Sequence, residues 1–239
     1  MIRKVLFSIL LVKFLMAGNI FLATSTNVSY ALDELIKEFK KDNPNINIKT
    51  TLASSGKLTA QIMHGAPYDI FMSANMKYPD LLYKRGIAIT KPKVYAKGAI
   101  SFFSVKYENP DFDTLEKVRQ IAIANPKFAP YGKAAIEAFK NRGIYDRIKN
   151  KLIYSETVTG VIPYTIHSAD VGIVAKSSLF SPNIKKIGKF YSKDVNPKYY
   201  TPIKQGVVLL KHNEDAKKFY DFLFTKKAKK IFKKYGYIE

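Results

Sequence analysis

The sequence predicts an α/β protein of two lobes, each built as a mostly parallel sheet flanked by helices. Short apolar segments alternate with amphipathic segments along the 239 residues, and this alternation is typical of parallel strands that helices cover on both faces. Two segments, 93–105 and 198–210, are basic, contain tyrosine and lead into an apolar run. We expect the chain to cross between the lobes at these segments. One lobe then holds residues 19–97 plus 200–239, and the other holds residues 98–199.

The individual elements follow from hydrophobic periodicity. In segment 28–41, for example, apolar residues recur every three or four positions and form one stripe of a helix. Strands are expected at 19–24, 46–52, 69–73, 100–105, 120–124, 152–155, 171–175, 187–191 and 203–210. Helices are expected at 28–41, 57–64, 78–85, 114–119, 133–141, 159–167 and 214–235, the last with a break near Lys226.

The first 18 residues have the layout of a secretory signal. A basic start at Arg3 and Lys4 precedes an apolar run broken only by Lys13, and the small residues Ala17 and Gly18 follow. The run is shorter than the roughly 20 apolar residues that a membrane-spanning helix needs. We therefore expect export to the periplasm and removal of residues 1–18. The residues just before the expected cut are larger than usual, so an uncleaved N-terminal anchor stays open as an alternative.

Composition and charge narrow the function classes. The chain has no cysteine, which predicts no disulfide, no thiolate metal site and no lipid anchor. The formal net charge is +21, and the three basic residues in the signal leave +18 on the rest. Such a charge suits nucleic acid, an anionic membrane surface or an anionic ligand. Export argues against nucleic acid as a partner, and the lysines of 226–234 have the spacing of a solvated helix face. A basic surface-binding protein without a small-molecule ligand stays open.

The sequence contains no recognisable catalytic centre. His64, His167 and His212 lie far apart, without the spacing of a metal site or a catalytic triad. The common motifs of nucleotide-binding proteins, hydrolases and zinc proteases are absent. Asp69 and Asp170 stand at the start of predicted strands, where capping or turn pairing is the expected role. We predict a binding protein that is not an enzyme and has no resident cofactor.

Two polar turns connect strands to helices in the first lobe. They read Thr-Ser-Thr-Asn at 24–27 and Ala-Ser-Ser-Gly at 53–56. Each offers polar side chains together with free backbone N–H groups at the start of a helix, where anions bind. Helix capping alone would explain either turn. Two turns at successive strand ends converge on one crevice, however, and segments 130–132 and 157–159 can add donors from the second lobe. The sequence therefore favours an oxyanion site between the lobes.

Longer motifs surround these turns. They are ATSTNVSYALDELIKEFKK (23–41), LASSGKLTAQIMHGAPYDIFMSAN (52–75), ANPKFAPYGKAAIEAF (124–139), ADVGIVAKSSL (169–179) and FYDFLFTKKAKKIFKKYGY (219–237). In these motifs the chain resembles the molybdate-binding proteins of bacterial ABC importers, which are periplasmic binding proteins with the type II fold. In that fold the chain changes lobes twice, and the resemblance covers nearly the whole mature chain.

The resemblance implies five ligand residues. The side chain and N–H group of Asn27 follow the first strand, with Thr26 beside it. Ser55 supplies the serine of the second turn. The backbone N–H groups of Tyr131 and Val158 complete the set from the second lobe.

The chain departs from the family pattern at three positions. Ala175 stands where some members have a tyrosine ligand, and Tyr131 stands where such members have a small residue. Asn27 replaces a serine found in other members. These departures imply a ligand shell without the usual hydroxyl, and the Tyr131 hydroxyl is one candidate to replace it.

The resemblance also implies the ligand and the partners. Molybdate or tungstate would be the ligand, bound only as the oxyanion, and a permease of the inner membrane with its ATPase would receive it from a monomeric protein. Helix N-termini and neutral donors suit a fully ionised tetrahedral dianion. Phosphate that carries a proton would need an acceptor, and none of these residues offers a carboxylate, whereas sulfate differs only in size. Sulfate, ferric iron and an organic anion remain the alternative ligands.

Overall fold

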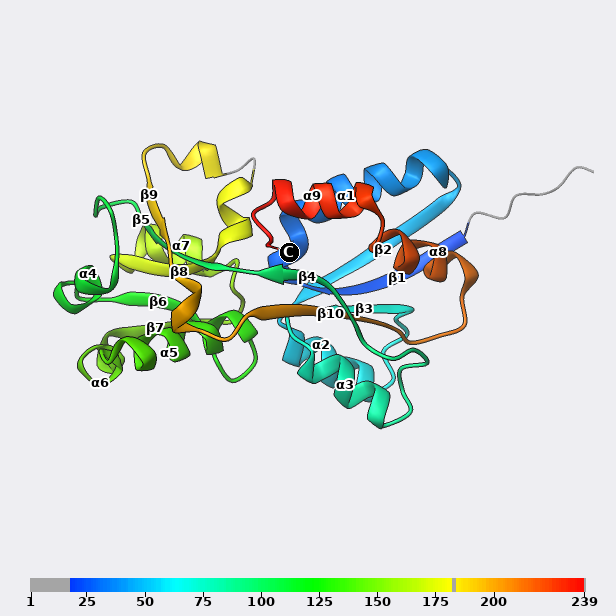
Figure 1. Ribbon diagram of the computed structural model, residues 1–239, viewed down its shortest axis with the longest axis horizontal. Helices are drawn as coiled ribbons and strands as arrows, with labels where there is room; N and C mark the ends of the chain where they lie inside the picture. Colours follow the sequence, from blue (N-terminus) through cyan, green and yellow to red (C-terminus); the bar gives the residue numbers. More distant parts are fainter. Residues whose placement is uncertain (1–17, 182–183, 239) are drawn as a thin grey trace, which may run out of the picture.

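The computed structural model describes residues 18–181 and 184–238, and its strands form two five-stranded sheets (Figure 1). The first sheet has the order β2-β1-β3-β10-β4. Its strands are β1 (Gly18–Ser25), β2 (Ile46–Ala53), β3 (Ile70–Ser73), β4 (Lys93–Gly98) and β10 (Ile203–Leu209). Strand β1 is parallel to β2 and β3, and β10 is antiparallel to β3 and β4. Only β10 therefore opposes the common direction of this sheet.

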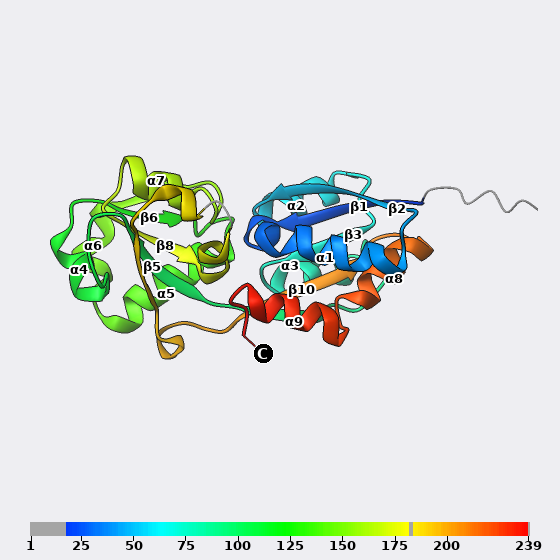
Figure 2. The same cartoon turned by 90° about the horizontal axis from the view of Figure 1, so that it is seen from above.

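The second sheet repeats this arrangement with the order β7-β6-β8-β5-β9. Its strands are β5 (Ile100–Ser104), β6 (Ile121–Ala124), β7 (Leu152–Ser155), β8 (Val171–Ala175) and β9 (Tyr191–Asp194). Strand β6 is parallel to β7 and β8, and β5 is antiparallel to β8 and β9. The two sheets lie in separate lobes, side by side (Figure 2). The predicted fold class, two lobes with mostly parallel sheets, is confirmed.

Helices cover both faces of the first sheet. Helices α1 (Ser29–Asp42), α8 (Glu214–Phe222) and α9 (Lys226–Lys234) pack on one face, and α2 (Ser55–Met63) and α3 (Lys77–Lys84) pack on the other (Figure 1). Alternate residues of a strand point to opposite faces. In β3, Ile70 and Met72 join the core under α1, whereas Phe71 joins the core under α2. This is why the first three residues of the strand are all apolar.

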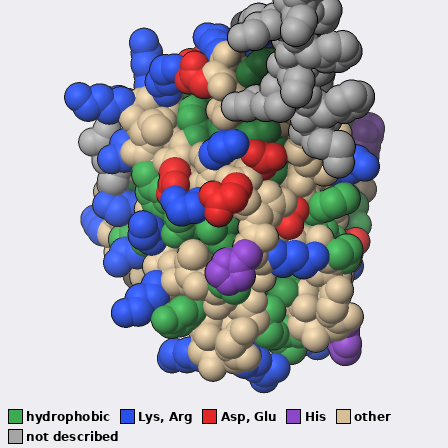
Figure 3. All heavy atoms as spheres, turned by 90° about the vertical axis from the view of Figure 1, so that its right-hand side faces the viewer, with side chains coloured by type: hydrophobic (Ala, Val, Ile, Leu, Met, Phe, Trp, Pro, Cys, Tyr) green, Lys and Arg blue, Asp and Glu red, His purple; other side chains and the backbone are tan. Residues whose placement is uncertain are grey.

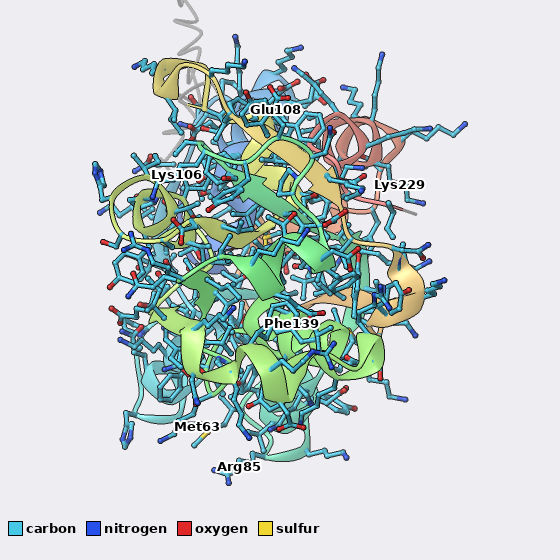
Figure 4. All side chains as sticks on the ribbon, turned by 90° about the vertical axis from the view of Figure 1, so that its left-hand side faces the viewer. Met63, Arg85, Lys106, Glu108, Phe139 and Lys229 are labelled. Carbon is cyan, nitrogen blue, oxygen red and sulfur yellow. The ribbon has the colours of Figure 1, made fainter. Side chains whose placement is uncertain are left out.

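The second lobe has one continuous core. Its helices are α4 (Phe112–Lys117), α5 (Pro130–Arg142), α6 (Tyr145–Ile148) and α7 (Val161–His167). Helices α5 and α7 lie on opposite faces of the sheet (Figures 1 and 2), and Phe139 of α5 is buried in this core (Figure 4). Short 3-10 helices complete the secondary structure: η1 (Thr26–Val28), η2 (Lys149–Lys151), η3 (Lys176–Phe180), η4 (Ile184–Ile187) and η5 (Pro197–Tyr199).

The chain passes between the sheets at the two segments predicted for this role. Strand β4 ends at Gly98 in the first sheet, and β5 begins at Ile100 in the second. The return runs from the end of β9 at Asp194 to the start of β10 at Ile203. Segment 93–105 therefore contains two strands that belong to different sheets.

Two local predictions differ in outcome. The strand expected at 187–191 is wrong, because helix η4 ends at Ile187 and Gly188 adopts a left-handed φ of 84°. This turn delays the strand, and β9 begins only at Tyr191. The break expected near Lys226 is confirmed, because α8 ends at Phe222 and Thr225 caps the start of α9 by accepting a hydrogen bond from the Ala228 N–H.

The predicted signal segment falls mostly outside the described residues. Gly18, expected as its last residue, begins β1 and pairs with Ile46 of β2. Within the described part of the chain, no helix has the length and apolar character needed to cross a membrane.

The two strand-leading aspartates bind backbone N–H groups of segments distant in the sequence, which differs from the capping or turn pairing expected. Asp69 accepts a hydrogen bond from a backbone N–H of β1 at 2.7 Å, and Asp170 accepts from the N–H groups of Arg119 and Gln120 at 3.0 and 3.2 Å. Burial alone raises the pKa of the Asp170 carboxyl. Hydrogen bonds from Lys106 and the two N–H groups outweigh burial and hold this pKa below its usual value. Each aspartate thus fastens its strand to a neighbouring segment of the same lobe.

Candidate functional site

The five predicted ligand residues lie around one cavity between the lobes. Thr26, Asn27 and Ser55 line it from the first lobe, and Tyr131 and Val158 line it from the second. The most exposed of the five is Thr26, at only 8%. The cavity has a volume of only about 10 Å³, which is about the room that one water molecule needs. In this arrangement the cavity is too small for a tetrahedral oxyanion, so its walls must move apart for one to bind.

The two turns of the first lobe meet because their strands are parallel neighbours. Strands β1 and β2 pair in register up to Ser25 and Ala53, so their carboxyl ends lie side by side. Helix η1 then begins at Thr26 and helix α2 at Ser55. The first N–H groups of a helix have no partner within that helix. The N–H groups of Thr26, Asn27 and Ser55 are therefore available to a ligand.

The second lobe presents helix α5 in the same way. Strand β6 ends at Ala124, and α5 begins at Pro130, a residue that suits the first helical position because it has no N–H group to satisfy. Tyr131 follows and offers the next N–H group. A Cβ atom at Gly132 would overlap the carbonyl oxygen of Ala124. Glycine at this position therefore lets the start of α5 pack directly on the end of β6.

Val158 lies in the turn that follows β7. The end of β7 is adjacent to the end of β6, with Ser155 paired to Ala124. The Ser155 hydroxyl donates to the carbonyl oxygen of Thr157 at 2.9 Å, and the Thr157 hydroxyl accepts from the Gly160 N–H at 3.2 Å. These bonds hold the turn around Val158 against the cavity.

The cavity is lined only by uncharged residues. Its wall is completed by Ser25, Ser54, Ala74, Ala129 and Pro130. Among these residues there is no carboxylate, no histidine and no cationic side chain, whereas each helix start contributes about half a positive charge. The Ser55 hydroxyl oxygen accepts from the Ala74 N–H at 3.0 Å, so its hydrogen is still free to donate. The cavity therefore attracts negative charge and offers it hydrogen-bond donors.

A larger groove adjoins the cavity. It has a volume of about 450 Å³, shares Ala129 and Pro130 with the cavity wall, and contains Lys77, Lys127 and Lys133. Lysines on both sides of the groove make its field positive, and such a field draws anions toward the opening.

The side chain of Asn27 is committed to protein partners. Its Nδ2 atom lies 2.9 Å from Gln205 Oε1, 2.8 Å from Tyr237 Oη and 3.2 Å from Tyr131 Oη, and its Oδ1 atom accepts from the Ser25 hydroxyl at 2.6 Å. We expected both the side chain and the N–H group to be ligands. In this structure the backbone N–H is the group of Asn27 that remains for an anion.

Tyr131 and Tyr237 are neutral phenols. Burial raises the pKa of both well above the ordinary value, and the neighbouring tyrosines Tyr237 and Tyr95 raise that of Tyr131 further. The Tyr131 oxygen accepts from Asn27 and from Gln205 Nε2, at 3.2 and 3.4 Å.

Ala175, the position where some related proteins carry a tyrosine ligand, is fully buried at the end of β8. It is not among the residues that line the cavity. The Tyr131 hydroxyl oxygen accepts from Asn27 and Gln205, so it helps to hold Asn27 while its own hydrogen stays available to donate.

Direct contacts join the two lobes around the cavity. The Gly56 N–H donates to the carbonyl oxygen of Phe128 at 3.1 Å, and the Ser177 hydroxyl donates to the carbonyl oxygen of Asn27 at 2.9 Å. Lys57 forms an ion pair with Glu156 at the surface. The structure is therefore that of the closed arrangement, in which donors from both lobes face one small volume.

Sequence reasoning missed part of this wall. Ser54 lies in the Ala-Ser-Ser-Gly turn, but the sequence does not identify it as a ligand, because the backbone conformation decides which of two adjacent serines faces the cavity. Ser25 and Ala74 were also missed. The described residues contain no group of three or more His, Cys, Asp or Glu side chains that could hold a metal ion.

Comparisons with known proteins agree with this geometry. The molybdate-binding protein ModA of Rhodobacter capsulatus is 30% identical over 230 residues, which cover 93% of this chain and 89% of the relative. The structure of the periplasmic molybdate-binding protein of Azotobacter vinelandii matches with a TM-score of 0.83 at 30% identity, covering 92% of this chain and 99% of that one.

The sulfate-binding protein SubI of Mycobacterium tuberculosis shares the fold, with a TM-score of 0.76 at 16% identity over 92% of this chain and 86% of that one. The family model described as bacterial extracellular solute-binding protein matches residues 20–238. This chain therefore belongs to the family of bacterial extracellular solute-binding proteins.

Proposed function

We propose that this protein captures molybdate or tungstate between its lobes and delivers it to an ABC importer. The observation that carries the proposal is the uncharged, buried cavity where helix starts from both lobes converge. The proposed ligands are Thr26, Asn27, Ser55, Tyr131 and Val158, with Asn27 acting through its N–H group. Similarity to the molybdate-binding proteins of R. capsulatus and A. vinelandii supports the same ligand.

The donor set favours an ion without a proton. Monohydrogen phosphate must donate one hydrogen bond, and the cavity has no carboxylate to accept it. Its hydroxyl would be buried beside other donors, which is unfavourable. Sulfate carries the right charge and is disfavoured only by its smaller size. Molybdate and tungstate are nearly equal in size, so the same cavity accepts both.

Export and delivery complete the proposal. Residues 1–18 direct the chain to the periplasm, where it acts as a monomer without a cofactor and without catalytic activity. Residues 19–97 plus 200–239 form one lobe and residues 98–199 form the other, with Gly98 added to the first because it ends β4 in the first sheet. Closure around the anion creates the surface that the permease and its ATPase recognise.

A basic surface-binding protein fits the observations less well. On one end of the first lobe, Lys and Arg side chains are scattered among acidic ones and do not gather in one patch (Figure 3). Lysines of α9, including Lys229, are exposed on the outside of the molecule (Figure 4). Both observations fit a solvated surface. A sulfate-binding protein is the stronger alternative, because its ligand differs only in size.

Equilibrium dialysis of the protein without residues 1–18 tests the proposal. We expect one molybdenum atom retained per chain, displaced by tungstate but not by a large excess of sulfate. Displacement by sulfate as readily as by tungstate would assign the cavity to the smaller anion.

A further inference from the structure

An unpartnered hydroxyl stands in the wall of the anion cavity. The side-chain oxygen of Ser54 is buried and has no hydrogen-bond partner in the described part of the chain. Ser54 lines the cavity and is only 3% exposed, so bulk water does not satisfy it. A buried hydroxyl without a partner is unfavourable, and native proteins seldom keep one without a function.

Helix capping does not account for this residue. Ser54 is the N-cap of α2 and has the extended backbone typical of that position, yet its side chain accepts no capping hydrogen bond. The N–H of Gly56, one of the usual donors to such a cap, instead donates to the carbonyl oxygen of Phe128 in the other lobe. The contact that closes the lobes thus removes a normal partner of the Ser54 hydroxyl.

We propose that the Ser54 hydroxyl donates a hydrogen bond directly to the bound oxyanion and is a sixth ligand residue. This inference builds on the proposed function and deepens it. In the closed arrangement Ser54 and Ser55 present adjacent hydroxyls from the start of one helix. In the closed arrangement the Gly56 N–H is engaged by the other lobe, so the anion is the partner left for the Ser54 hydroxyl.

Calorimetric titration of Ser54→Ala with molybdate tests the proposal. A hydrogen bond to a charged group predicts that affinity falls about tenfold or more. Thr24→Val is the matched control, because the Thr24 hydroxyl is also buried and unpartnered but Thr24 does not line the cavity. Its affinity should equal that of the wild type. Saturating molybdate should raise the melting temperature of Ser54→Ala less than that of the wild type.

Other outcomes separate the two proposals. If the wild type binds molybdate and Ser54→Ala binds it equally well, the ligand role of Ser54 is wrong and the proposed function stands. A molybdate-induced rise in the melting temperature of Ser54→Ala equal to that of the wild type would also overturn this role. If the wild type binds neither molybdate nor tungstate, the proposed function itself fails.

Discussion

Asn27 and Tyr237 form a reciprocal pair of hydrogen bonds. Asn27 Nδ2 donates to Tyr237 Oη at 2.8 Å, and the same hydroxyl donates to the carbonyl oxygen of Asn27 at 2.9 Å. Tyr131 and Ser177, from the second lobe, contact the same asparagine. The residue whose N–H group is proposed to bind the anion is therefore held from both lobes. Ligand binding and lobe closure meet at this residue.

Asn27→Ala should weaken molybdate binding and lower stability together. The N–H group remains, but the acceptors on Gln205 and Tyr237 lose their buried donor, which costs about 1–3 kcal/mol. Affinity should fall by at least about 1 kcal/mol because the turn is less firmly held. Calorimetry and urea unfolding measure the two effects. Asn141→Ala removes an exposed side-chain bond to Tyr199 and is the control, and equal behaviour of the two variants would contradict this role.

Ser55→Ala should lose affinity mainly through the missing donor. A hydrogen bond to a charged group contributes about 1.5–3 kcal/mol, so the dissociation constant should rise about tenfold or more. Ser29→Ala is the control, because Ser29 starts α1 but does not line the cavity. Unchanged affinity in Ser55→Ala would move the anion away from this turn.

Gly56→Ala should impair closure. A Cβ atom there would lie 2.9 Å from the Tyr78 hydroxyl and 3.2 Å from the carbonyl oxygen of Phe128 in the other lobe. The lobes must then stay slightly apart, and we expect weaker binding with faster release in stopped-flow measurements. Lys57→Ala is a neighbouring control that breaks only an exposed ion pair, so its effect should stay below about 1 kcal/mol. If Gly56→Ala releases the anion at the wild-type rate, the close approach of Gly56 to Phe128 does not limit closure.

Anion affinity should not change between about pH 6 and pH 9. The cavity wall contains no group that titrates there, and burial keeps the pKa of Tyr131 and Tyr237 above the ordinary value, so both stay protonated. Because the pKa of each tyrosine is higher in the folded than in the unfolded state, both residues stabilise the fold at pH values below the unfolded pKa, which is near 10. This contribution to stability is lost as the pH rises above that value. Titrations across the pH range measure the affinity, and a step near neutral pH would reveal a titrating ligand that the cavity does not contain.

The sequence predicts the sheets better than their connections. Strands such as β3 are identifiable because both faces are buried, and their apolar runs are short and bounded by turns. The strand at 187–191 is misplaced because one glycine, Gly188, adopts a left-handed turn that hydrophobicity does not report. Edge strand β4 contains both charged and apolar residues. Its sequence runs into that of β5 without a turn signal, so the pattern does not separate the two strands.

The candidate site is predictable only in part. The turns at Asn27 and Ser55 are visible because polar residues follow strands, and the resemblance adds Tyr131 and Val158. The bonds that hold Asn27 join it to Gln205 and Tyr237, which are 178 and 210 positions away. No local pattern reports such contacts. The availability of Ser54 likewise depends on a contact between the lobes.

Calorimetric titration of the mature protein with molybdate, tungstate, sulfate and phosphate tests the central claim most directly. We predict one-to-one binding of molybdate and tungstate with similar affinity, much weaker binding of sulfate, and no heat from phosphate. Heat with sulfate or phosphate, and none with molybdate or tungstate, would contradict the account.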